Sequence, residues 1–197
     1  MIGFVLTLSF VLVTVAFRSV VVAVSAVVMN LLSVGAAYGL IVLVFQHGYA
    51  VDTLGFTEVA TIEPWLPLFL FAILFGLSMD YQVFLLSRIR ERYDATGDNS
   101  ESVVYGLQST AGIITGAAMI MVVVFAGFAS GELVQLQQMG FGLAVAIALD
   151  ATLVRTFLVP ATMQLLGDAN WYFPSFLDWI PDIRVEPPVR DSASSPD

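Results

Sequence analysis

The chain has 197 residues, of which 58% are hydrophobic and 12% are charged. Soluble domains carry about 25% charged residues, so this composition, with a mean hydropathy of +0.90, excludes an ordinary soluble domain and indicates a membrane protein. The formal net charge of −9 argues against nucleic acid as a partner. Because cysteine is absent, a disulfide framework and thiol chemistry are excluded.

The sequence contains five apolar runs, each close to or above the roughly 20 residues that a helix needs to cross a bilayer. In chain order they cover about 1–17, 20–45, 64–87, 104–129 and 139–158. The sequence therefore predicts an all-α fold, an integral membrane bundle of five transmembrane helices.

Residues 1–168 are predicted to form this transmembrane domain, and residues 169–197 an interfacial aromatic segment followed by a disordered cytoplasmic tail. The aromatic residues expected to anchor that segment at the membrane surface are Trp171, Tyr172, Phe173 and Trp179.

The arginines predict the orientation of the bundle. Outside the apolar runs they occur after the first run, after the third run and in the tail, as Arg18, Arg88, Arg90, Arg92, Arg184 and Arg190. The other two loops, about 46–63 and 130–138, contain no lysine or arginine. Positively charged loops stay in the cytoplasm, so the C-terminus is expected inside and the N-terminus outside. Such a start, with no charged leader, indicates the tail half of a longer protein or a misassigned start codon.

Asp80 stands inside the third run, and Arg88 follows it after roughly 12 Å of helix rise. A charged residue at that depth costs at least about 3 kcal/mol on insertion scales. One interpretation is a neutral aspartate that only hydrogen-bonds a neighbouring helix. The other is a proton or ion relay, because a buried carboxyl group can bind and release a proton. Tyr81 points about 100° round the helix from Asp80, so the two side chains must meet different partners.

A second charged pair, Asp150 and Arg155, lies in the fifth run. Five residues of α-helix place the two side chains about 140° apart, which is poor geometry for a bridge within one helix. Arg155 can instead reach a carboxylate on another helix or extend towards the cytoplasm. A structural ion pair and a role in coupling both remain open.

Other polar and small residues in the runs favour helix packing. Side chains able to hydrogen-bond across helices are Asn30, Ser33, Ser109, Thr110 and Thr115. Gly112 and Gly116 have the small-xxx-small spacing that lets another helix approach closely. The lone histidine, His47, is expected to be a solvated loop residue.

Two membrane aspartates also suggest an intramembrane aspartyl protease, whose site resembles Tyr-Asp on one helix and Gly-x-Gly-Asp on another. Here the order is Asp80-Tyr81, and Asp150 follows Ile147-Ala148-Leu149, so the match fails. No HExxH, GxSxG or glycine-rich phosphate loop is present. We therefore expect no enzyme activity, no cofactor and no metal.

Several stretches closely resemble one family. Phe75–Tyr81 reads FGLSMDY and is followed by VFLLSRIRE, which is similar to the MmpL family, large actinobacterial membrane proteins of the resistance-nodulation-division (RND) superfamily. Further similar stretches are Arg18-Ser19 with Asn30–Ser33, Thr115–Val122, and Leu149–Arg155 with Pro160-Ala161.

The resemblance implies twelve spans in two similar halves, each half with a large outside domain after its first span. This chain is similar only to spans eight to twelve. In the family, Asp-Tyr pairs on the fourth and tenth spans face each other and relay protons. Asp80 and Tyr81 would be the tenth-span pair, Arg88 an arginine near the inner end of that span, and Asp150 with Arg155 a linked twelfth-span pair.

The expected function is therefore the C-terminal membrane half of a proton-motive-force-driven exporter of lipids or other hydrophobic envelope molecules, in the plasma membrane. The partners implied are membrane lipid, protons, and either a missing N-terminal half or further copies of the chain. The alternative is a non-transporting membrane subunit or a truncated, non-functional fragment. An isolated monomer is expected to be poorly stable, since Asp80 and Tyr81 would face lipid or another copy.

Overall fold

The computed structural model describes residues 2–49, 51, 55–56 and 61–174. Within these residues every regular element is helical, as the all-α prediction requires. The elements are α1 (Ile2–Phe17), α2 (Val20–Ile41), the π-helical η1 (Val42–Gln46), α4 (Leu66–Thr96), α5 (Asn99–Ala129), α6 (Val134–Leu149), the π-helical η2 (Asp150–Leu158), α7 (Val159–Leu166) and the 3₁₀-helical η3 (Gly167–Trp171). The last four segments form one continuous helix, Val134–Trp171.

Four of these helices are long and apolar enough to cross a membrane: Val20–Gln46, Leu66–Thr96, Asn99–Ala129 and Val134–Trp171. The first helix, α1, is apolar but has 16 residues, about 24 Å of rise against roughly 30 Å of hydrocarbon. Its place as a fifth span stays a prediction, as does the orientation of the bundle.

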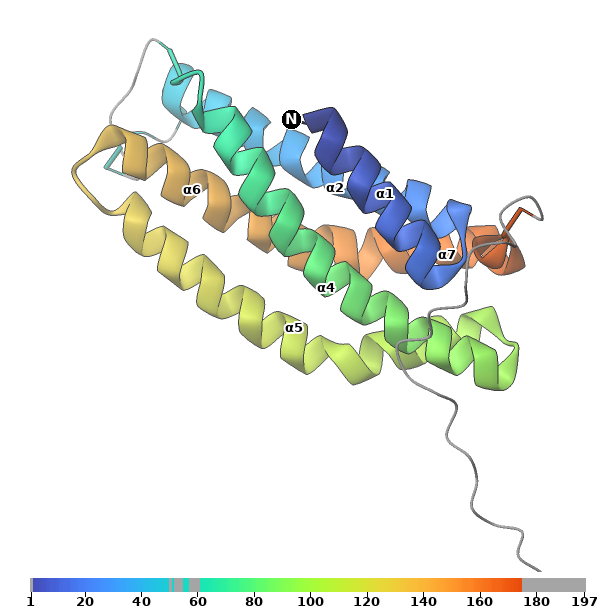
Figure 1. The fold of residues 1–197 in the computed structure, drawn as a ribbon. Coiled ribbons are helices and arrows are strands. Elements are labelled where there is room, and N and C mark those ends of the chain that lie inside the picture. Colours follow the sequence, from blue (N-terminus) through green and yellow to red (C-terminus); the bar gives the residue numbers. More distant parts are fainter. Residues whose placement is uncertain (1, 50, 52–54, 57–60, 175–197) are drawn as a thin grey trace, which may run out of the picture.

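The continuous helix Val134–Trp171 runs through the bundle and contacts α2, α4 and α5, whereas α1 lies on one side against α2 and α4 (Figure 1). The most apolar stretch of Val134–Trp171 is 50% buried, while that of α5 is only 11% buried. The long central helix therefore holds the bundle together, and α5 is peripheral.

The turns at one end of the bundle follow local capping chemistry. Gly97 ends α4 with a φ of 70°, the left-handed conformation that suits glycine after a helix. Asp98 then caps α5 by accepting a hydrogen bond from the Glu101 amide at 3.0 Å. Ser19 caps α2 in the same way through the Val22 amide at 3.1 Å. We call this the arginine end, because Arg18 and the arginines of α4 lie there.

Two hydrophobic clusters fill the bundle, and a polar band separates them. One cluster, nearer the arginine end, includes Leu85, Ile89 and Met163. The other includes Phe45, Leu70 and Leu143. The residues buried between the two clusters are polar: Asn30 and Ser33 on α2, Ser78 on α4, and Asp150 and Arg155 on η2. The buried faces of three helices, α2, α4 and the long helix, thus each carry polar residues in the band between the two clusters.

Glycines permit the closest helix contacts, but not the pair expected. A Cβ on Gly140 would lie 2.4 Å from the Ala129 amide nitrogen, so α5 and α6 touch backbone to backbone there. Gly106 and Gly142 instead face side chains, those of Ile89 and Ile41 respectively. The pair predicted to be a contact, Gly112 and Gly116, is exposed on α5, and no described residue outside its own helix comes within 4 Å of either position.

Among the residues expected to bond across helices, the outcome also varies. Asn30 and Ser33 do bond to other helices. Ser109 and Thr110 instead donate to the Gly106 carbonyl of their own helix. His47 is exposed, as expected of a loop residue.

A second set of polar contacts closes the arginine end. The Asn170 amide donates to the Gly167 carbonyl at 2.7 Å and also to the Met163 carbonyl, while Ser19 donates to the Asn170 carbonyl. The Trp171 indole donates to Asn99 at 3.2 Å. Asn170 thereby ties the end of the long helix to the start of α2.

Of the aromatic residues predicted as membrane anchors, Trp171 packs within the arginine end. Trp171 stacks on Tyr93 with ring centroids 4.6 Å apart, and Arg90 lies over the indole. Tyr172 is 62% exposed. Trp179 and the predicted disordered tail lie outside the described residues.

Replacing Asn170 with alanine should lower the free energy of unfolding by about 1–3 kcal/mol, since buried carbonyls lose their donor. Asn170 is only 1% exposed, so water cannot substitute. Equilibrium unfolding in mixed detergents checks this, with Gln108→Ala on the exposed face of α5 as the matched control. Equal losses in both variants would show that the Asn170 contacts are not specific.

Candidate functional site

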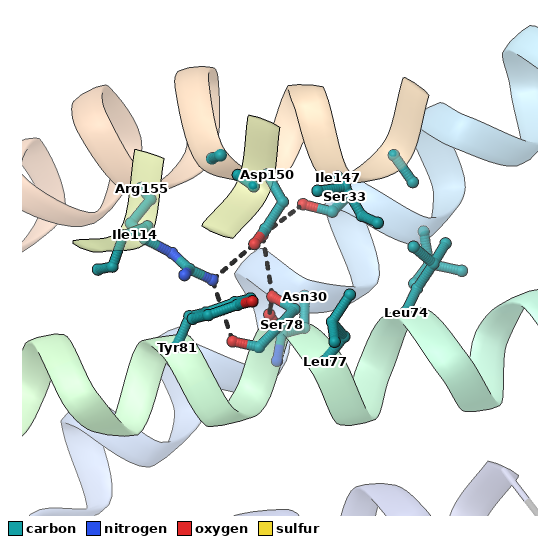
Figure 2. A pocket seen from close by; sticks show the side chains of 14 residues that line it. Asn30, Ser33, Leu74, Leu77, Ser78, Tyr81, Ile114, Ile147, Asp150 and Arg155 are labelled. Carbon is teal, nitrogen blue, oxygen red and sulfur yellow. Dashed lines mark hydrogen bonds and ion pairs between the residues drawn. The ribbon is translucent and has the colours of Figure 1, made fainter. Parts of the chain in front are cut away.

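The polar band surrounds a small cavity between α2, α4, α5 and the long helix (Figure 2). Its volume is about 20 Å³, which is room for about one water molecule. The apolar part of the wall includes Leu74, Leu77, Ile114 and Ile147. Charged and hydrogen-bonding side chains therefore meet around a cavity in the interior of the bundle.

Asp150 and Arg155 form a buried ion pair at the centre of the site. The Arg155 Nη2 atom lies 2.6 Å from the Asp150 Oδ2 atom, and the two side chains are 11% or less exposed. The expectation of poor geometry within one helix was wrong. It assumed an α-helix, whereas residues 150–158 are π-helical, and the wider π turn brings residues five apart onto one face.

A proline that is compatible with a wider turn lies just after the π segment. Pro160 occupies the first turn of α7, and a proline has no amide hydrogen to donate to the preceding turn and clashes with its carbonyl. Thr156 donates its hydroxyl hydrogen to the Ala151 carbonyl at 3.0 Å, which is five residues earlier. The sequence around Pro160 therefore favours the register that joins Asp150 to Arg155.

Arg155 has two further contacts, and both are on α4. Its Nη2 atom donates to the Ser78 carbonyl at 3.0 Å. Its guanidinium lies over the Tyr81 ring at 5.2 Å from the centroid, a cation–π contact. The arginine therefore fastens the long helix to α4.

The other carboxylate oxygen of Asp150 meets two hydroxyls. Ser78 lies 2.9 Å from Oδ1 and Ser33 lies 3.2 Å from it. The Ser78 hydroxyl is also 2.7 Å from the Asn30 Oδ1 atom. The Asn30 Nδ2 atom in turn donates to the Met79 sulfur at 3.6 Å. The result is a continuous chain of contacts from α2 across α4 to η2.

Ser78 was missed by the sequence analysis. A signal was available, since Ser78 stands three residues before Tyr81 and residues three apart share a helix face. Asn30 and Ser33 were assigned only to packing, although both contribute to the surroundings of Asp150.

The site brings together only some of the predicted relay residues. Tyr81, Asp150 and Arg155 line the same cavity. Asp80 is exposed on another face of α4 and makes no hydrogen bond or ion pair with the described part of the chain. Arg88 lies at the arginine end, where it pairs with Glu91 at 2.7 Å. Asp80 and Tyr81 thus have different surroundings, in agreement with their 100° separation.

Chemically, the arrangement can hold a charge and move a proton. Asp150 has a cation on one oxygen and hydroxyls on the other, and hydroxyls both donate and accept hydrogen bonds. Among the residues that the structure describes, no three acidic or histidine side chains gather closely enough to hold a metal ion.

A bundle of apolar helices with a buried ion pair defines the class as a multi-pass membrane protein with ionisable groups in its interior, a feature typical of transporters. The MMPL family profile matches residues 1–181. The chain belongs to the MMPL family and is a multi-pass protein of the plasma membrane.

Three relatives illustrate the similarity. The "Mycolic acid-containing lipids exporter MmpL11" of Mycolicibacterium smegmatis is 46% identical over 94% of this chain and 20% of its own length. The "Heme uptake protein MmpL11" of Mycobacterium tuberculosis strain H37Rv is 45% identical over 94% of this chain and 19% of its own. The "Trehalose monomycolate exporter MmpL3" of Mycolicibacterium smegmatis is 37% identical over 92% of this chain and 19% of its own. The chain thus spans about one fifth of these relatives.

Proposed function

We propose that this chain is the C-terminal membrane part of a proton-driven exporter of lipids or other hydrophobic envelope molecules, and that it carries part of the proton relay. The observation that carries the proposal is the Asp150–Arg155 pair, 2.6 Å apart and buried. Ionisable residues inside a membrane bundle are energetically costly and usually serve a function. Tyr81 lies against the same arginine. Two relatives have printed names that state lipid export, which supports the cargo class.

In this mechanism Asp80 takes a proton from one side of the membrane, and Asp150 responds inside the bundle. Asp80 and Tyr81 are neighbours on α4, so a movement of the helix at Asp80 also moves Tyr81, which lies against Arg155. Arg88, paired with Glu91 near the arginine end, would hold the inner end of α4 in place. The exposed position of Asp80 fits a carboxylate that completes its site with residues outside this chain, either a separate N-terminal half or another copy.

The decisive experiment is Asp80→Asn in cells that depend on this gene. Asparagine keeps the size of the side chain but cannot release a proton, so export of acetate-labelled envelope lipid to the cell surface should be abolished. The amount of protein in the membrane should stay unchanged. Asp94→Asn is the matched control, because Asp94 is exposed at the arginine end and pairs only with Arg90 in the described structure.

Equal export by Asp80→Asn and the unmodified protein would refute the proposed role of Asp80 in a proton relay. The second candidate, a non-transporting subunit that only stabilises a partner, would then gain support. It predicts that the partner is still co-purified with the Asp80→Asn variant, in the same amount as before.

A further inference from the structure

The Ser78 hydroxyl lies between two oxygens and has one hydrogen. Its distances are 2.7 Å to the Asn30 Oδ1 atom and 2.9 Å to the Asp150 Oδ1 atom. A serine hydroxyl donates once and accepts the rest, so it cannot donate to both. Either Asp150 carries a proton on Oδ1 and donates it to Ser78, or the Asn30 amide turns and donates to Ser78.

The surroundings of Asn30 favour an amide oxygen directed at Ser78. With its oxygen towards Ser78, the Asn30 Nδ2 atom faces the Met79 sulfur at 3.6 Å, and a thioether sulfur is a weak acceptor. Turning the amide would place its oxygen against that sulfur, which has no hydrogen to donate. Asn30 is 1% exposed, so water does not compensate. The Asn30 oxygen and an ionised Asp150 therefore compete for the single Ser78 hydrogen.

The two oxygens of Asp150 have different neighbours. Oδ2 is held by the Arg155 guanidinium at 2.6 Å, and a guanidinium only donates hydrogen bonds. Oδ1 faces the hydroxyls of Ser33 and Ser78, and a hydroxyl can reverse its role. A proton added to Oδ1 finds an acceptor, whereas a proton added to Oδ2 would face the N–H groups of Arg155.

We propose that Ser78 and Asn30 are positioning residues that form a hydroxyl–amide switch reading the protonation of Asp150 at Oδ1. This deepens the proposed function and rests on it. When Asp150 is ionised, Ser78 donates to Oδ1 and the Asn30 amide group donates to Ser78. When a hydronium ion delivers a proton, one of its O–H bonds breaks, an O–H bond forms at Oδ1 and water is left. Ser78 then turns its hydrogen to the Asn30 oxygen, and the amide NH2 group turns towards Met79. Loss of the proton to water reverses each step.

Few charged groups act on this switch. The titratable or charged side chains that line the cavity, among the described residues, are Asp150 and Arg155 from η2 and Tyr81 from α4. The neighbours from α2, α5 and α6 are uncharged, namely Asn30, Ser33, Val34, Ile114, Ala118, Ala146 and Ile147. The charged or titratable side chains that share the cavity with Asp150 are therefore Arg155 and Tyr81.

Infrared difference spectra between acidic and alkaline buffer test the switch. The sample is the chain in the assembly extracted from its native membrane. A protonated carboxyl group gives its own carbonyl stretching band, and the Asp150 band is the one that Asp150→Asn removes. In Ser78→Ala this band should move to higher frequency, because its O–H group loses its acceptor. Ser78→Thr keeps the hydroxyl and should restore the original frequency.

Asn30→Ala gives an independent reading should Ser78→Ala fail to fold. Without the Asn30 oxygen, the Ser78 hydroxyl has no acceptor for its own hydrogen and accepts more weakly from protonated Asp150. The Asp150 band should therefore also move to higher frequency, by less than in Ser78→Ala. The proposal is overturned when no Asp150 band appears, or when Ser78→Ala and Asn30→Ala leave its frequency unchanged.

The spectra separate this inference from the function on which it rests. The band reports Asp150 whether or not cargo is moved. A switch seen in the spectra together with full export by Asp80→Asn would refute the exporter proposal alone. If export depends on Asp80 but the frequency of the Asp150 band is the same in Ser78→Ala and Asn30→Ala as in the unmodified protein, the switch alone is refuted.

Discussion

Arg155→Met should destabilise the bundle by about 3–5 kcal/mol, the loss expected when one partner of a buried ion pair is removed. Methionine fills much the same space but leaves Asp150 without its cation at 2.6 Å. The variant also frees the Ser78 carbonyl that Arg155 now binds at 3.0 Å. Equilibrium unfolding in mixed detergents, on the assembly extracted from the native membrane, gives the free energy directly.

Two further variants make the result specific. The double variant Asp150→Asn with Arg155→Met removes both charges and should recover much of the loss, which a double-mutant cycle measures. Arg92→Met removes a cation whose side chain is 39% exposed at the arginine end and pairs with Glu101. An exposed pair contributes about 1 kcal/mol or less. A loss at Arg155→Met no larger than at Arg92→Met would show that the buried pair does not hold the long helix to α4.

The ion pair also marks where sequence reasoning ended. Hydrophobicity located the apolar runs well, because length and composition depend on the bilayer and not on partners. The angle between Asp150 and Arg155 was wrong because it assumed 100° per residue through residues 150–158, which are π-helical. Pro160 is visible in the sequence, but a proline inside a helix is compatible with a kink, a break or a wider turn. The sequence alone does not choose among them.

The sequence contains a clear signal for the turn between α4 and α5, but only a weak one for Ser78. The Gly97-Asp98 pair is a helix end followed by a cap, and it explains why α4 and α5 extend past the apolar runs to Thr96 and Asn99. Ser78 depends on tertiary structure, because a serine on an apolar helix is ordinary until a second helix places Asp150 2.9 Å away. The relay role of Asp80 remains a prediction.

Gly140→Ala should be the most damaging alanine substitution among the glycines of the bundle. The new Cβ would lie 2.4 Å from the Ala129 nitrogen and 2.5 Å from the Phe125 carbonyl oxygen. These are backbone atoms, so no rotamer change relieves the clash, and α5 and α6 must separate. Overpacking of this kind costs about 1–3 kcal/mol or more. Gly106→Ala meets chiefly the Ile89 side chain, which can move in part, so its loss should be smaller.

Gly116→Ala is the control with the opposite expected sign. Nothing outside its own helix approaches within 4 Å in the described structure, and alanine favours the helix over glycine by about 1 kcal/mol. Unfolding should therefore show a neutral or slightly stabilised protein. If instead Gly116→Ala destabilised the assembly from the native membrane while leaving the isolated chain unaffected, a helix from outside this chain would pack on α5. The small-xxx-small prediction for Gly112 and Gly116 would then be correct for a contact between chains or halves, and not for a contact within this one.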